Sequence, residues 1–132
     1  MLIFVDTSAF MAVLNADDQS HADARRVWED LITREAALVC SNYVLVETFA
    51  LLQNRLGMAA VKTFQDDVLP VLTVEWVDET LHRAGIAALL TANRRQLSLV
   101  DCISFEMMRR LGIKTAFTHD RRFAEQGFEC LP

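Results

Sequence analysis

The sequence contains few residues of the kinds that build linkers, long loops or disulfide frameworks. Its 132 residues include only 4 Gly and 2 Pro, which leaves little length for extended loops or low-complexity tracts. The three cysteines, Cys40, Cys102 and Cys130, are odd in number, far apart and without CxxC spacing. This pattern is typical of reduced, buried thiols rather than of disulfides or a thiolate metal site. We therefore expect one domain over residues 1–132, without repeats or an internal boundary.

The sequence also lacks the long apolar run that a membrane protein needs. No run approaches the ~20 residues of a membrane span. The first residues carry no basic segment and only four apolar residues before Asp6, unlike a signal peptide. These absences predict a cytoplasmic protein that does not interact with a membrane.

Positive charge is scarce overall but occurs in pairs. The net charge of −5 gives no long-range attraction to phosphate. Arginine nevertheless comes in adjacent pairs, at 25–26, 94–95, 109–110 and 121–122. Any one pair is explained by a solvated helix face, and local basic patches around an acidic centre remain an alternative.

Short apolar runs alternate with segments of helical periodicity. The runs typical of strands cover residues 2–5, 37–40, 71–77, 114–118 and 128–131. Segments of helical spacing cover residues 9–14, 21–33, 43–56, 59–68, 79–91 and 98–111. The alternation predicts an α/β fold with three layers, a short parallel β-sheet flanked by helices.

Local signals mark several of the expected helix ends. Ser20 with Asp23, and Ser98 with Asp101, have the spacing of a capping box. Gly112 is a residue typical of helix C-termini.

The helix expected over residues 43–56 carries a carboxylate among apolar residues. Its first ten residues are almost wholly apolar, which predicts burial on nearly all sides, and Glu47 falls in the stripe Val44, Glu47 and Leu51. Burying an uncompensated charge costs several kcal/mol. Glu47 must therefore pair with an arginine, lie at the wet end of the stripe or take part in a functional site, and the pattern leaves these alternatives open.

Three more acids stand at expected strand ends or helix starts. Asp6 and Asp120 follow the strands at 2–5 and 114–118, and Asp101 is three residues beyond Ser98. Capping explains Asp6 and Asp101 individually. The carboxyl ends of parallel strands, however, meet at one edge of a sheet, so the four carboxylates converge there in the expected fold. They would repel one another unless divalent cations neutralise them, and oxygen-only ligands favour Mg²⁺ or Mn²⁺.

These residues resemble the four acidic motifs of a known nuclease family. The motifs are Val5-Asp6-Thr7-Ser8, Val46-Glu47-Thr48, Ser98-Leu99-Val100-Asp101 with Ser104, and Phe117-Thr118-His119-Asp120-Arg121-Arg122-Phe123. In order and spacing they resemble those of PIN-domain nucleases, most of all the small VapC-type toxin ribonucleases of toxin-antitoxin systems. The resemblance spans essentially the whole chain.

The resemblance implies a site that holds one or two Mg²⁺ or Mn²⁺ ions. The implied ligands are Asp6, Glu47, Asp101 and Asp120, with Thr7, Ser104 and Thr118 as polar neighbours. Some members carry another acid near the last two motifs, where this chain has Ser104 and Arg122. We therefore expect one firmly bound ion and a second that arrives with substrate.

The implied activity is that of a metal-dependent endoribonuclease. A divalent ion activates water for in-line attack on an RNA phosphodiester bond and stabilises the developing charge. Arg121 and Arg122 are expected to contact substrate phosphates. The implied partners are RNA, a cognate antitoxin and a second copy in a homodimer, for which the 52% hydrophobic content is a further argument. Trp28 and Trp76 are candidates for the exposed apolar surface.

Two other classes of protein share some of these features. A Mg²⁺-binding phospho-acceptor signalling domain has a similar length and an acidic pocket, but needs paired acids after the first strand, where Asp6 stands alone. A non-catalytic α/β binding module explains Asp6, Asp101 and Asp120 as caps or surface charges but leaves Glu47 unexplained.

Overall fold

The computed structural model describes residues 1–132 as alternating strands and helices. The strands are β1 (Leu2–Val5), β2 (Ala37–Ser41), β3 (Leu72–Glu75), β4 (Thr115–Phe117) and β5 (Glu129–Leu131). The α-helices are α1 (Thr7–Leu14), α2 (His21–Thr33), α3 (Asn42–Arg55), α4 (Met58–Thr63), α5 (Glu79–Ala92), α6 (Leu99–Leu111) and α7 (Arg122–Glu125). A π-helical turn, η1 (Phe64–Val68), and a 3₁₀ turn, η2 (Leu69–Val71), connect α4 to β3.

The five strands form one parallel sheet in the order β3-β2-β1-β4-β5. The central strand β1 is apolar throughout, and its last three residues are fully buried because both faces of the sheet are covered. Its register pairs Val5 with Phe117 of β4. The residues that follow these two strands, Asp6 and Thr118, are therefore neighbours at the carboxyl edge of the sheet.

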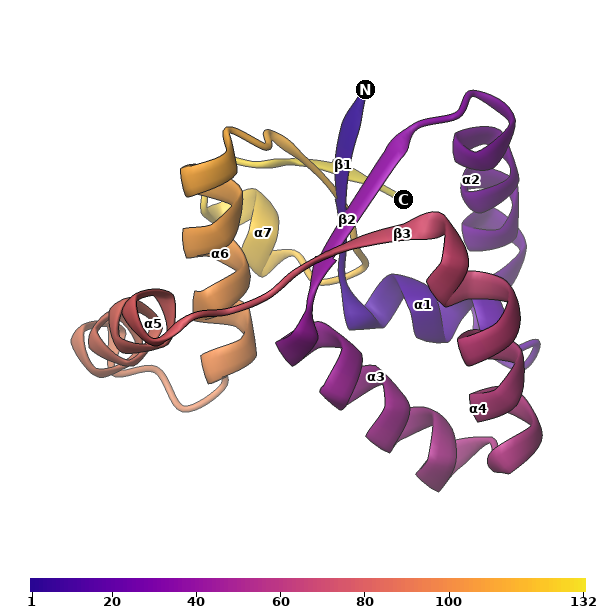
Figure 1. Ribbon diagram of the computed structural model, residues 1–132, viewed down its shortest axis with the longest axis horizontal. Coiled ribbons are helices and arrows are strands. Elements are labelled where there is room, and N and C mark those ends of the chain that lie inside the picture. The colour runs from indigo at the N-terminus through magenta and orange to yellow at the C-terminus, as the bar shows by residue number, and fades with distance from the viewer.

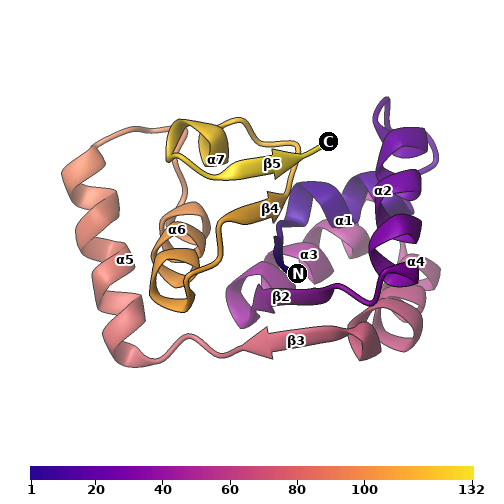
Figure 2. The ribbon, with the colours of Figure 1, turned by 90° about the horizontal axis from the view of Figure 1, so that it is seen from above.

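Helices cover both faces of the sheet, which gives the three layers (Figure 2). Helices α1, α2 and α4 lie on one side, and α5, α6 and α7 on the other. Each layer has its own aromatic cluster: Phe10 packs edge-on against Phe64 at 5.1 Å between ring centroids, and Phe105 against Phe123 at 4.9 Å. The predicted fold class, a short parallel sheet flanked by helices, is confirmed.

Helix α3 lies at the carboxyl edge of the sheet rather than inside a layer (Figure 1), where it contacts α1, α4 and α6. The prediction that its first ten residues are buried on nearly all sides is wrong. Only Val44, Thr48 and Leu52 are buried, whereas Val46 is 70% exposed. A helix at the rim of a sheet has neighbours on one face only, so its apolar composition does not report burial.

The two expected capping boxes have different outcomes. Ser98 and Asp101 form the complete box at the start of α6. The prediction for Ser20 and Asp23 is wrong, because the Ser20 side chain makes no capping bond and Asp23 pairs with Arg26 instead. Arg26, one turn along the helix, gives Asp23 an ionic partner in place of the helix terminus.

Two further features were not expected from the sequence. The short helix α7 begins directly after the last acidic motif. Trp28, a candidate for exposed apolar surface, is instead partly buried against Phe10, whereas Trp76, the other candidate, is 74% exposed. None of the helices combines the length and the apolar composition needed to cross a membrane.

Candidate active site

Asp6 is the most deeply buried acid of the candidate site. It caps α1 and is only 5% exposed. Its Oδ2 accepts hydrogen bonds from the hydroxyls of Ser8 at 2.8 Å and Thr118 at 3.1 Å. Burial raises the pKa of Asp6 to about 6 although these hydrogen bonds oppose the change, and the negative charges of Asp101 and Glu47 raise it further. The protein thus holds this carboxylate rigidly while its charge is only partly compensated.

Two hydroxyls connect Asp6 with the last acidic motif. Thr118 Oγ1 accepts a hydrogen bond from the Asp120 N–H at 3.0 Å, and Ser8 Oγ accepts one from the His119 N–H at 2.9 Å. The loop that carries Asp120 is therefore fixed against the start of α1. The sequence analysis did not assign a role to Ser8, although a hydroxyl two residues after a helix-capping Asp is well placed to hydrogen-bond with it.

Asp101 lies in the first turn of α6 and has two kinds of partner. Its Oδ2 accepts a hydrogen bond from the Ser98 N–H at 3.0 Å, which is the capping role, and lies 3.3 Å from Nη1 of Arg122. The same carboxylate therefore caps α6 and contacts Arg122, so a capping role does not exclude a role in the site. Helix α6 fixes the backbone of Asp101, and the carboxylate faces the loop after β4.

Arg122 lies among the acids. Its Nε is 3.5 Å from Asp120 Oδ1, its Nη1 contacts Asp101, and its guanidinium donates to the Gln96 carbonyl. Arg122 was expected from the sequence to contact substrate phosphate, and this remains a prediction. In this structure its guanidinium is instead engaged by protein oxygens.

Glu47 lies on α3 and faces the same cavity. Glu47 is half-buried, and its side chain makes no ion pair or hydrogen bond within the chain. Pairing with an arginine, one of the alternatives left open by the sequence, is therefore not seen. The remaining explanations for Glu47 are a hydrated carboxylate and a ligand.

All four acids line one cavity of about 580 Å³. Thr7 also lines it, although its hydroxyl donates to the Val44 carbonyl at 3.4 Å and accepts from Thr48 at 3.1 Å, which ties α1 to α3. Thr118 is buried behind Asp6. Ser104 does not line the cavity, because its hydroxyl donates to the Val100 carbonyl within α6. The cavity lining also includes residues that the sequence analysis did not single out for the site, among them Asp18, Ser20, Arg55, Gln96 and His119.

A second polar cavity of about 550 Å³ shares a wall with the first. Its lining contains no apolar residue and consists of Arg94, Gln96, His119, Asp120, Arg121, Arg122 and Glu125. Gln96, His119, Asp120 and Arg122 line both cavities. An acidic cavity and an arginine-rich one therefore lie side by side.

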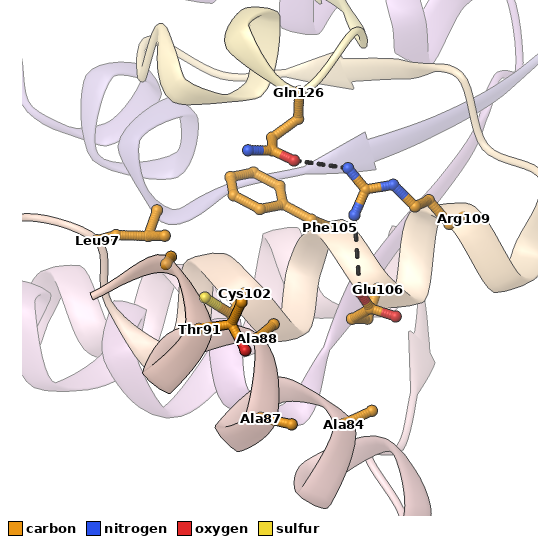
Figure 3. A pocket seen from close by; sticks show the side chains of 11 residues that line it. Ala84, Ala87, Ala88, Thr91, Leu97, Cys102, Phe105, Glu106, Arg109 and Gln126 are labelled. Carbon is orange, nitrogen blue, oxygen red and sulfur yellow. Dashed lines mark hydrogen bonds and ion pairs between the residues drawn. The ribbon is translucent and has the colours of Figure 1, made fainter. Parts of the chain in front are cut away.

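A third cavity, of about 520 Å³, lies between α5 and α6 and has a different character (Figure 3). Most of its lining is apolar, with Phe105, Leu97 and several alanines. Its one acid, Glu106, lies 3.7 Å from Arg109, which also donates a hydrogen bond to Gln126. This cavity offers no set of anionic ligands.

The acidic cavity fits a divalent cation in the chemistry of its donors. Carboxylate and hydroxyl oxygens are the ligands that Mg²⁺ and Mn²⁺ prefer. Burial is the main cause of the raised pKa of Asp6, and a cation would offset both this cost of the charged form and the smaller repulsion from Asp101 and Glu47. No three His, Cys, Asp or Glu side chains stand close enough together to enclose an ion in this arrangement. Binding therefore requires side-chain movement, for which Glu47 is free.

Comparisons with known proteins identify the family of the chain. The PIN domain family model matches residues 3–129. The chain is 38% identical over 128 residues to the 23S rRNA-specific endonuclease VapC20 from two strains of Mycobacterium tuberculosis, a match that covers 96% of this chain and 95% of the relative.

Solved structures give the same result. The crystal structure of M. tuberculosis VapC20, described as a sarcin-ricin loop cleaving toxin, superposes with a TM-score of 0.83 at 37% identity and covers 96% of this chain and 95% of that one. That of FitAcB from Neisseria gonorrhoeae, at 14% identity and a TM-score of 0.70 over 100% and 97% of the two chains, shows the shared fold alone. The predicted family, fold and class of activity, a VapC-type PIN nuclease, are confirmed, and the phospho-acceptor and binding-module alternatives receive no support. The chain belongs to the PIN-domain family.

Proposed function

We propose that the chain is a Mg²⁺- or Mn²⁺-dependent endoribonuclease that hydrolyses RNA phosphodiester bonds at the acidic cavity. The observation that carries the proposal is the convergence of Asp6, Glu47, Asp101 and Asp120, from four separate segments, on one cavity. Capping accounts for Asp6 and Asp101 one at a time, but it does not account for Glu47 or for the convergence.

In this proposal the four carboxylates hold the ion, and their neighbours keep them in place. A bound divalent ion supplies an activated water and stabilises charge on the phosphate and the leaving oxygen. Ser8 and Thr118 orient Asp6 through hydrogen bonds to one oxygen, Oδ2, which leaves Oδ1 available. The Ser98 N–H orients Asp101 in the same way.

We propose that two exposed arginines contact the phosphates of the substrate. Arg55 lines the acidic cavity from the end of α3, and Arg121 lines the adjacent polar cavity. Neither forms an ion pair within the chain, so both guanidinium groups are available to phosphate oxygens.

We extend the proposal to the substrate and partners on the basis of the relatives. Ribosomal RNA of the large subunit is the first substrate to test, because VapC20 is a 23S rRNA-specific endonuclease and covers almost the whole chain. We propose a toxin role, with a cognate antitoxin and a homodimer in the cytoplasm. Exposed Val46, Trp76 and Leu90, each at least 70% accessible, provide apolar surface for such contacts.

The proposal is tested by RNA cleavage with Mn²⁺, Mg²⁺ or EDTA. Asp101→Asn should lose most activity, because a ligand charge is removed. Glu106→Gln is the matched control: it removes an acid from the same helix, but one that faces the apolar cavity. Metal-independent cleavage, or equal losses in both variants, would refute the proposed site. A phospho-acceptor signalling domain would instead be phosphorylated by a small phosphate donor, so incubation with such a donor should give no phosphoprotein.

A further inference from the structure

The carboxylates of the acidic cavity differ in how their charge is compensated. Asp101 and Asp120 each lie within 3.5 Å of a guanidinium nitrogen, and in both cases the guanidinium belongs to Arg122. Asp6 and Glu47 have no ionic partner. Arg55 lines the cavity but pairs with none of the acids. The positive charge in the cluster is therefore concentrated between two of the four acids.

The backbone of Arg122 is firmly held, whereas its side chain is partly exposed. Its N–H donates to Asp120 Oδ1 at 2.9 Å. The next residue, Phe123, is fully buried against Phe105 and Phe4 and so anchors α7 in the core. The Arg122 side chain itself is 29% exposed. A rotation of this side chain is therefore the simplest rearrangement that releases Asp101 and Asp120.

We propose that Arg122 is a built-in counter-ion, which occupies the cation position between Asp101 and Asp120 in the metal-free protein and is displaced by the incoming divalent ion. The inference rests on the proposed metal site. Two largely buried carboxylates without a counter-ion repel each other, and a tethered guanidinium neutralises them without a metal. The same guanidinium then competes with Mg²⁺ or Mn²⁺ for the two carboxylates.

The second polar cavity provides the destination for the displaced side chain. Arg122 lines both cavities, and Arg94 and Arg121 line the second one. Arg94 lies 3.3 Å from Glu125, whereas Arg121 forms no ion pair. A guanidinium that leaves the acids therefore joins the unpaired Arg121, and there it can meet a substrate phosphate. Metal binding and phosphate binding are thereby coupled through the Arg122 side chain. The contact between Arg122 and phosphate that the sequence predicts would then form only when the metal ion is bound.

The test measures metal binding without RNA. Mn²⁺ is titrated calorimetrically into the metal-free full chain and into Arg122→Gln, Arg122→Lys and Arg121→Gln. Arg122→Gln should bind Mn²⁺ about tenfold more tightly than the parent, because the competing charge is gone. Arg122→Lys should remain near the parent. Arg121→Gln, which removes an adjacent charge that pairs with no acid, should stay within about twofold.

The parent chain supplies a second measurement that does not depend on any variant's folding. The Nε–Hε resonance of Arg122, assigned by its loss in Arg122→Lys or by sequential connectivity, should move to the position of solvent-exposed arginines on titration with Mg²⁺. If Arg122→Gln binds Mn²⁺ no more tightly than the parent, or if the Arg122 resonance does not move at saturating Mg²⁺, the inference is overturned but the proposed metal site is not. Absence of binding by the parent and Arg122→Gln alike would overturn the metal site and, with it, this inference.

Discussion

Replacing Asp6 with asparagine should stabilise the metal-free protein at neutral pH. The folded chain raises the pKa of Asp6 from its ordinary value of 3.8 to about 6, chiefly through burial. The folded state therefore binds this proton more tightly than the unfolded state does. The corresponding stability is fully present below pH 3.8 and is lost as pH rises through about 6.

The size of the effect follows from the same values. The interval from 3.8 to about 6, at about 1.4 kcal/mol for each pH unit, corresponds to about 3 kcal/mol of lost stability at pH 7.5. Asparagine avoids this loss. Its carbonyl oxygen can replace Oδ2, which accepts the bonds from Ser8 and Thr118, and its amide can replace Oδ1, which accepts none. The side-chain amide group of the asparagine finds no hydrogen-bond partner in the protein and needs water, which offsets part of this gain. We therefore expect a net gain in stability of about 1–3 kcal/mol.

The assay is urea unfolding of the parent and Asp6→Asn in EDTA at pH 4.5, 6 and 7.5. The variant should be more stable than the parent at pH 7.5, and the difference should shrink towards pH 4.5. Asp101→Asn is the contrasting variant, because its carboxylate is compensated by the Ser98 N–H and by Arg122. It should lose stability by about 1 kcal/mol at pH 7.5. A pH-independent difference, or a less stable Asp6→Asn at pH 7.5, would refute the reasoning.

Three further predictions concern other parts of the chain. Gly85→Ala should destabilise the protein by about 1–2 kcal/mol in urea unfolding, because the new Cβ would clash with Ile103 Cδ1 and lie 2.8 Å from Cγ1. Ile103→Val removes Cδ1, so the double variant should lose less stability than the sum of the two single variants. A loss equal to that sum would contradict the clash. Arg121→Ala should lower by about 1 the slope of log Kd against log salt for an uncleavable RNA in EDTA, whereas an unchanged slope would place this side chain away from RNA. Burial raises the pKa of the Cys40 thiol to about 12, so iodoacetamide at pH 8 should label Cys40 only after unfolding. Rapid labelling of Cys40 itself in the native chain, located by peptide mass spectrometry, would show that β2 opens.

The features that the sequence predicted correctly depend on residues close together in the chain, or on the order in which such short motifs follow one another. The apolar run before Asp6 is read from four neighbouring residues, and the capping box of Ser98 and Asp101 from positions three apart. The order and spacing of the acidic motifs were sufficient to predict the family by resemblance. The convergence of the acids could be predicted because parallel strands bring their carboxyl ends to one edge whatever the loops between them.

Tertiary packing decided which side chains meet. Thr118 is 112 residues from Asp6, and Arg122 is 21 residues from Asp101; no local periodicity reports such pairs. Packing also left Val46 exposed and Glu47 without an ionic partner, because α3 lies at the rim of the sheet. The sequence determined that four acids reach one edge, since strand patterning and connectivity are local rules. The structure decided that Arg122 lies between two of them, since ion pairing depends on where α6 and α7 pack in three dimensions.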